Sequence, residues 1–175
     1  IMVSEADTND TLKANARMNV TFVDDGTNSR SLGFVCEDAV GTSDTARSFS
    51  TSGIDLVTDA GARLVQYDIT GITDGIRLTE GAGSASTARL ATVVLIGGAD
   101  VTGVNVSDVG LGNTGAAIAK TGLGFEPDVI FTACTGQTNE VTGYAVHGIL
   151  SLGAACNNAT IEQSVVSVSS EDNAT

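Results

Sequence analysis

Basic residues are scarce in this chain. Its 175 residues include eight Lys and Arg against 21 Asp and Glu, which gives a formal net charge of -13. Only Lys13, Arg17 and Arg30 come near one another along the sequence, and acidic residues surround them. Proteins bind phosphate backbones through clustered Lys and Arg that release counterions. We therefore expect no nucleic-acid partner, and an acidic surface that keeps the protein soluble.

Long apolar runs are also absent. The best candidate, residues 93–96 (V-V-L-I), is far too short to cross a bilayer, and the first residues form no signal-peptide pattern. We therefore predict no membrane insertion. Because the chain begins with Ile1 and ends inside a repeat described below, we expect a processed product or a fragment of a longer protein.

Residues suited to catalysis or metal binding are few. The three cysteines, Cys36, Cys134 and Cys156, match no metal-binding spacing, so we expect small, half-buried side chains. The only histidine, His147, lies inside a predicted strand, and no serine occupies the G-x-S-x-G turn that a hydrolase would need. We predict no catalytic residue.

The residues that are abundant indicate an all-β fold. Glycine (21 residues), Thr, Ser, Val and Ala dominate, with one proline and no tryptophan, a composition suited to short strands and tight turns. Period-two alternation predicts a hairpin over 16–36. Residues 88–96 are apolar on both faces and predict a central strand, whereas 39–53 read as a loop. Further strands are expected at 54–57, 63–70, 76–79, 101–106, 129–134 and 143–153. This spacing favours a β-sandwich, jelly-roll-like.

The end of the chain echoes its beginning. Residues 163–175 align with 30–42 when one gap is allowed, and 129–135 followed by a turn and a strand repeat the plan of 1–23. The matched positions are Gln163, Ser164, Val165, Val168, Glu171 and Asp172 on Arg30, Ser31, Leu32, Val35, Glu37 and Asp38. The period of about 130 residues exceeds that of solenoid repeats. Residues 1–175 are thus either one β-sandwich domain or a slice of a tandem array, with 1–36 and 129–170 as equivalent hairpins.

Two motifs could be mistaken for binding sites. Residues 110–115 (G-L-G-N-T-G) have the form of a dinucleotide-binding loop, but no βαβ unit surrounds them, so we expect an inter-strand loop and no cofactor. Turns rich in Asp and Asn are candidate Ca²⁺ sites, through Asp7, Asp10, Asp24 and Asp25, although neither turn matches an EF-hand and turn chemistry explains both. The acid pairs at 24–25, 37–38 and 171–172 would need to face each other across a cleft to cleave glycosides.

The motif G-F-E-P-D at 124–128 has a physical explanation. Pro127 restricts its own φ and biases Glu126 towards extended geometry, and Asp128 can cap the turn, so that the following strand enters the sheet in a defined register. We expect Phe125 to anchor this corner in the core.

Together these elements resemble a known family. The opener at 124–128, the run S-D-T-A-R at 43–47 and the strand that leads into G-G-A-D-V-T resemble the repeated β-rich unit of structural proteins in tailed bacteriophages, notably marine ones, whose units open with G-F-x-P-D-x-V-I-F. The resemblance implies a virion component without enzymatic activity, located in the tail, fibre, neck or capsid surface. It transfers no catalytic residues.

Two functional hypotheses from different classes follow. In the first, the chain is a virion structural protein that assembles as a homo-oligomer or with other virion subunits, with host surface glycans as a further candidate partner. In the second, it is a secreted cellular filament, adhesin or surface-layer subunit assembled by β-strand exchange. Both place it in a virion or outside the cell. A glycan-cleaving spike enzyme that uses Asp24, Glu37 or Glu171 is a weaker third class.

Overall fold

The structure, a computed structural model, is all-β. It describes residues 2–4, 16–24, 28–37, 45–58, 63–81, 90–112, 115–136, 143–158 and 160–170, and none of these residues lies in a helix. The strands are β1 (Met2–Ser4), β2 (Ala16–Val23), β3 (Ser29–Cys36), β4 (Thr45–Ser50), β5 (Ile54–Val57), β6 (Arg63–Ile72), β7 (Gly75–Glu80), β8 (Leu90–Thr92), β9 (Val129–Cys134), β10 (Gly143–Val146), β11 (Gly148–Asn158) and β12 (Thr160–Ser170).

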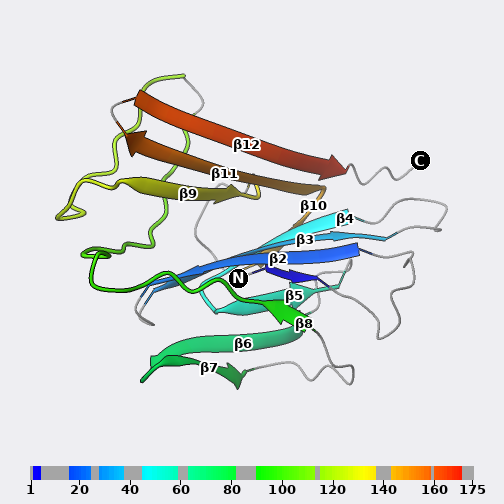
Figure 1. Ribbon diagram of the computed structural model, residues 1–175. Helices are drawn as coiled ribbons and strands as arrows, with labels where there is room; N and C mark the ends of the chain where they lie inside the picture. Colours follow the sequence, from blue (N-terminus) through cyan, green and yellow to red (C-terminus); the bar gives the residue numbers. More distant parts are fainter. Residues whose placement is uncertain are drawn as a thin grey trace.

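The strands form three antiparallel sheets. The central sheet has the order β10-β4-β3-β2-β1-β8, the C-terminal sheet has the order β12-β11-β9, and the β5–β7 sheet has the order β5-β6-β7. Figure 1 shows the central sheet lying between the other two. The chain thus reaches β9 only after it has built most of the central sheet.

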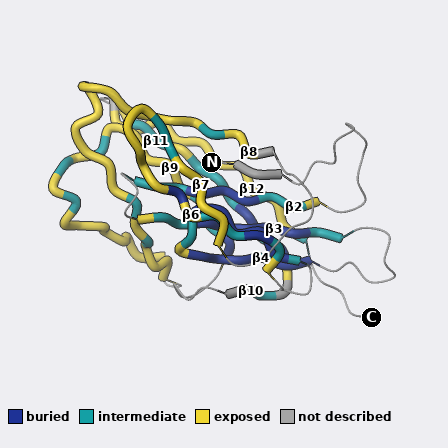
Figure 2. Tube along the Cα trace, turned by 90° about the horizontal axis from the view of Figure 1, so that it is seen from below, coloured by how far each residue is buried: buried dark blue, intermediate teal, exposed yellow. Residues whose placement is uncertain are grey.

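The hairpin of β2 and β3 has two buried faces. Cross-strand partners Val20 and Leu32 lie on one face, and their neighbours Thr21 and Ser31 lie on the other. Alternation of apolar and polar residues usually separates a buried face from a solvated one. Here the polar face is buried as well: Thr21 and Ser31 are each 1% exposed. Buried residues accordingly gather along β2, β3 and β4 in Figure 2.

The C-terminal sheet covers the apolar face of the hairpin. Leu150 of β11 is buried in one cluster with Val20, Leu32, Phe34 and Phe49, and Leu152 and Ala133 pack against the same cluster. Burying such aliphatic and aromatic side chains contributes about 1.5–3 kcal/mol each before conformational entropy is subtracted. This contact is the main apolar core.

The β5–β7 sheet covers the polar face. Its own apolar side chains form a second cluster, in which Ile54, Leu56, Val65 and Ile69 are buried and Val23 of β2 packs against them. A smaller cluster joins Val35 and Ala46 of the central sheet to Val57 of β5. The polar side chains of the hairpin therefore face the backbone of β5.

A long irregular segment connects β8 to β9. Residues 93–112 and 115–128 contain no strand, and most of their large apolar side chains are exposed. An ion pair from Arg30 of β3 to Asp108 holds the segment to the central sheet, and Lys120 Nζ donates to the Asp108 carbonyl oxygen at 3.2 Å. Structureless connections of this length are uncommon in compact domains.

Several strand predictions are confirmed and others are wrong. Strands occur as expected at 16–23, 54–57, 63–70 and 129–134, and at 76–79 within β7. Residues 45–50, predicted as loop, form β4 because they pair with both β3 and β10. The predicted central strand at 88–96 is only the three-residue edge strand β8, with residues 94–96 between 65% and 71% exposed, and 101–106 form no strand. The strand predicted at 143–153 is broken at His147 into β10 and β11.

The first prediction concerns the close approach of Ser48 of β4 and the backbone of β5 to Gly33 of the hairpin. A Cβ atom added to Gly33 would clash with Ser48 Oγ and lie 3.5 Å from the Asp55 carbonyl oxygen. Gly33→Val is therefore expected to lower the free energy of unfolding by about 1–3 kcal/mol, the range for overpacked cores. Denaturant unfolding measures the difference. Gly110→Val is the control, because nothing lies within 4 Å of its Cβ position. Equal stability of the two variants would contradict the close approach.

Candidate functional site

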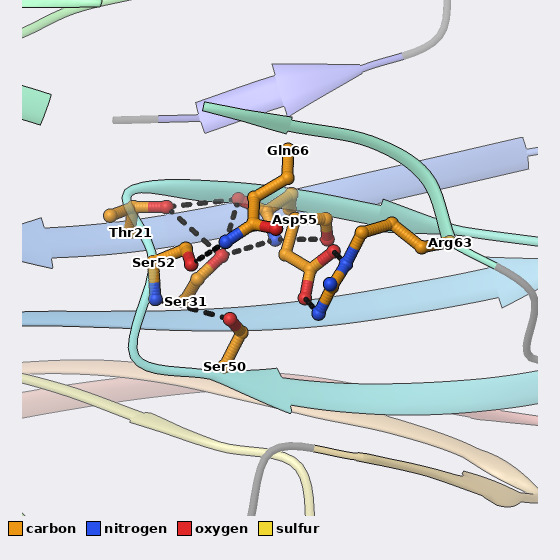
Figure 3. A network of polar contacts seen from close by, with 8 residues as sticks. Thr21, Ser31, Ser50, Ser52, Asp55, Arg63 and Gln66 are labelled. Carbon is orange, nitrogen blue, oxygen red and sulfur yellow. Dashed lines mark hydrogen bonds and ion pairs between the residues drawn. The ribbon is translucent and has the colours of Figure 1, made fainter. Parts of the chain in front are cut away.

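A buried polar layer between β5 and the β2–β3 hairpin is the densest set of polar side chains in the described structure. Asn19, Thr21, Ser31, Ser48, Ser50 and Asp55 are all at most 3% exposed. Asn19 Nδ2 donates to Ser31 Oγ at 2.7 Å and to the Asp55 carbonyl oxygen at 3.0 Å, and Thr21 Oγ1 donates to Asn19 Oδ1 at 2.9 Å. The Thr21 hydroxyl, which has one hydrogen to donate, also lies within hydrogen-bonding distance of the Gly53 carbonyl oxygen. These bonds join the central sheet to the backbone around β5 (Figure 3).

An ion pair lies at the outer edge of this layer. It is the only ion pair that the described residues of the layer form. Arg63 at the start of β6 donates to both carboxylate oxygens of Asp55, from Nε at 3.0 Å and from Nη2 at 3.3 Å. Gln66, the cross-strand partner of Asp55, donates to Ser52 Oγ. Figure 3 shows these side chains meeting beside the turn that precedes β5. Two-point binding by a guanidinium fixes the position of the carboxylate.

The chemistry of this layer is that of a structural contact. Its donors are hydroxyl and amide groups, its acceptors are side-chain oxygens and the backbone carbonyl oxygens of Gly53 and Asp55, and its carboxylate is held by Arg63. Buried polar groups remain stable when they are hydrogen-bonded in this way. The exception is Ser48 Oγ, which is buried without a hydrogen-bond partner among the described residues and lies over Gly33. Sequence reasoning missed the layer, although the polar alternation of Asn19, Thr21 and Ser31 was visible.

His147 lies at a corner where the chain changes sheets. Its φ is 65°, and it is exposed between β10, which pairs with β4, and β11, which belongs to the C-terminal sheet. Arg47 Nη1 donates to the His147 carbonyl oxygen at 3.1 Å, and the Gly148 amide donates to Thr45 Oγ1 at 3.2 Å. A Cβ on Gly148 would lie 2.5 Å from the Phe34 ring, so glycine permits β11 to start directly over β3. The expectation of a mid-strand histidine is therefore wrong.

The other singled-out residues are placed apart from one another. Cys36, Cys134 and Cys156 are half-buried free thiols, as expected. Asp24 accepts hydrogen bonds from the backbone amide of Asn28 at 2.8 Å and from its side chain at 2.6 Å, which is turn chemistry. The other calcium candidates, Asp7, Asp10 and Asp25, lie outside the described residues, as do Asp38, Glu171 and Asp172. No group of three or more His, Cys, Asp and Glu that could hold a metal ion occurs among the residues that are described.

The opener at 124–128 is fixed from the far end of β11. The Asn157 amide donates to the Asp128 carbonyl oxygen at 2.9 Å, and its side chain donates to Glu126 Oε1 at 3.0 Å. Phe125 is half-buried, with its ring 2.7 Å from a Cβ position at Gly103, so it packs on the irregular segment and not in the core that was expected. Residues 110–112 and 115–120, on either side of two undescribed positions, form neither strand nor helix and so provide no βαβ context.

The second prediction tests the buried polar layer. Asn19→Ala removes the Nδ2 group that donates to Ser31 Oγ and to the buried Asp55 carbonyl oxygen, so we expect the free energy of unfolding to fall by about 1–3 kcal/mol. Urea unfolding measures the change, and Asn105→Ala, at an exposed position, serves as control. A loss no larger than that of the control would show that the layer contributes little.

The third prediction tests the corner at His147. Left-handed backbone disfavours residues with a Cβ atom by roughly 1–2 kcal/mol. His147→Gly is thus expected to keep or raise the melting temperature, and His147→Val to lower it. Both variants remove the imidazole, so the comparison isolates the backbone. The opposite order would contradict the corner geometry.

Comparisons with known proteins identify no relative of this chain. No protein-family model matches the chain, and neither the curated proteins nor the solved structures contain a significant match. Within the residues described, no helix has the length and apolar character needed to cross a membrane. The site must therefore be interpreted from its own geometry.

Proposed function

We propose that this chain is a non-enzymatic structural subunit of a tailed-bacteriophage virion, a slice of a tandem array of β-rich units of about 130 residues. In this proposal the sheets form β-sandwich units, and the partners are other copies or other virion subunits. The station is the tail, fibre, neck or capsid surface, and host surface glycans are a candidate ligand. The proposal rests on the fold and on the sequence resemblance given above.

One observation carries the proposal: the first and last hairpins pair in the same register. Val23 pairs with Ser29 in the β2–β3 hairpin, and Cys156 pairs with Glu162 in the β11–β12 hairpin. Adding 133 to both residue numbers of the first pair gives the second pair, because 23 becomes 156 and 29 becomes 162. The sequence echo aligns Arg30 with Gln163 by the same shift. Since a slip of one residue would turn every side chain to the opposite face, this agreement supports a repeated unit.

Strand order supports the same conclusion. In the first copy β1 pairs with β2 and β2 with β3, and in the second β9 pairs with β11 and β11 with β12, all antiparallel. The opener precedes β9, where the hydrogen bonds from Asn157 tie it to β11. Arrays of such units serve architecture or attachment, which is the expected role of a virion component.

The cellular alternative uses the same exposed strands. A secreted filament, adhesin or surface-layer subunit would join copies by strand exchange at a free sheet edge, and β12 is such an edge. Gene order separates the two proposals. Neighbouring portal, terminase or tail genes would support the virion, and neighbouring secretion genes would exclude it.

The fourth prediction tests the location directly. Antibodies raised against the purified chain are expected to label intact tailed particles in immunogold electron microscopy of a culture that expresses the native gene. Antibody absorbed with the purified chain is the control and should leave the particles unlabelled. Label confined to cell-surface filaments or soluble material would contradict a virion role.

A further inference from the structure

Equivalent positions of β3 and β12 differ sharply in exposure. Under the shift of 133 positions, Leu32 corresponds to Val165 and Val35 to Val168. Leu32 is 7% exposed and Val35 is 1% exposed, whereas Val165 is 75% exposed and Val168 is 42% exposed. β3 has eight residues and β12 has 11, and each is the second strand of its hairpin, paired with β2 and with β11 respectively. What differs is the set of elements around them.

Three elements bury β3, and the described residues form no counterpart of any of them beside β12. β4 pairs with the free edge of β3, β5 approaches its polar face, and the C-terminal sheet covers its apolar face. Among the described residues, β12 pairs only with β11 and forms the edge of its sheet. In Figure 1 β12 is the outermost strand of the upper layer, and Figure 2 shows exposed residues along the rim of the molecule.

The free edge of β12 also lacks the devices that usually protect edge strands. The strand is 11 residues long and contains neither proline nor lysine, and its one charged residue is Glu162. It exposes Ile161, Val165 and Val166 at 70%, 75% and 68%. Soluble proteins shield such edges with charge, proline or a covering element, because unpaired backbone groups accept another strand.

We propose that the edge of β12 binds a strand with the chemistry of β4, donated in antiparallel orientation by another unit of the same kind that carries the S-D-T-A-R run. This inference rests on the proposed function, since it takes the neighbour to be another unit of the same kind. The donated strand occupies beside β12 the place that β4 occupies beside β3. Main-chain hydrogen bonds supply the affinity, and alternate side chains supply the specificity.

Transposing the β3–β4 register by 133 positions gives a specific pairing. β3 pairs Ser31 with Ser50, Leu32 with Phe49, Val35 with Ala46 and Cys36 with Thr45. The same register on β12 sets Ser164 opposite the serine, Val165 opposite the phenylalanine, Val168 opposite the alanine and Ser169 opposite the threonine. In these four of the six pairs apolar side chains meet apolar ones and hydroxyl-bearing residues meet hydroxyl-bearing ones, while the other two pairs set Val166 opposite Ser48 and Ser167 opposite Arg47. Cross-strand pairs of these kinds stabilise antiparallel sheets.

The fifth prediction uses a peptide as the probe. A labelled peptide of residues 43–52 (S-D-T-A-R-S-F-S-T-S) is titrated against the whole chain, and hydrogen exchange locates the contact. We expect saturable binding that slows amide exchange in residues 160–170 and leaves exchange in β3 unchanged. A peptide with Ser48→Pro should not bind, because proline lacks the amide donor and distorts the strand.

A pair of variants on β12 tests the register. Val165→Lys places a charge opposite the phenylalanine and is expected to weaken binding about fivefold, the scale of one lost cross-strand pair. Ile161→Lys is the matched control: Ile161 is 70% exposed on the same face of β12, but in the transposed register it lies beyond the last residue of the peptide. This control should bind the peptide as the unchanged chain does.

Each other outcome overturns the proposal. These outcomes are absence of binding, equal weakening by both variants, protection of β3 in place of β12, and self-association of the chain through β12 without peptide. Because the titration uses the isolated chain, its result is independent of where the protein resides. If the peptide does not bind but the antibodies label the particles, only this docking is overturned. If the peptide binds but the particles stay unlabelled, only the virion role is overturned.

Discussion

The hydrogen bonds from the β2–β3 hairpin to the backbone around β5 are the contact on which the rest of the fold depends. Asn19 and Thr21 donate across the sheets to the carbonyl oxygens of Asp55 and Gly53, and the Cβ position of Gly33 lies 3.5 Å from the Asp55 carbonyl oxygen. A strand with one polar face is usually solvated on that face. Here the polar face is a second interior, so that the central sheet can be covered on both sides by sheets of this small chain.

Part of this architecture could be predicted from the sequence. Alternation located the hairpin of β2 and β3 and the strand β6, whereas the turn at 124–128 located β9. β4 was missed because T-A-R-S-F-S at 45–50 has no strong local pattern, and its strand character comes from pairing with β3 and β10. Residues 94–96 have strand-like composition, yet they lie outside β8 and are exposed. In both segments the presence or absence of a strand depends on pairing with distant parts of the chain, which a single sequence does not specify.

The burial of the polar layer likewise could not be predicted from the sequence alone. The sequence identifies Asn19, Thr21 and Ser31 as one face of a hairpin, but the element that covers this face comes from β5, more than 20 positions further along the chain. His147 and Phe125 were likewise predicted for positions within a strand and in the core, and their neighbours Gly148 and Gly103 place them at a corner and on the irregular segment. The echo between the two ends is a feature of the sequence itself, and the repeated unit that it indicates stays a prediction.

In this account β3 and β12 differ mainly in the elements that pack around them, and less in their local sequence. Assembly with another unit would supply the packing elements that β12 lacks. A map of the assembled particle by electron cryomicroscopy, at a resolution that shows side chains, tests this claim most directly. The account predicts an antiparallel strand from another unit of the same kind beside β12, with an aromatic side chain opposite Val165. A β12 edge that faces solvent in the particle, or that pairs with β12 of a second copy, would contradict it.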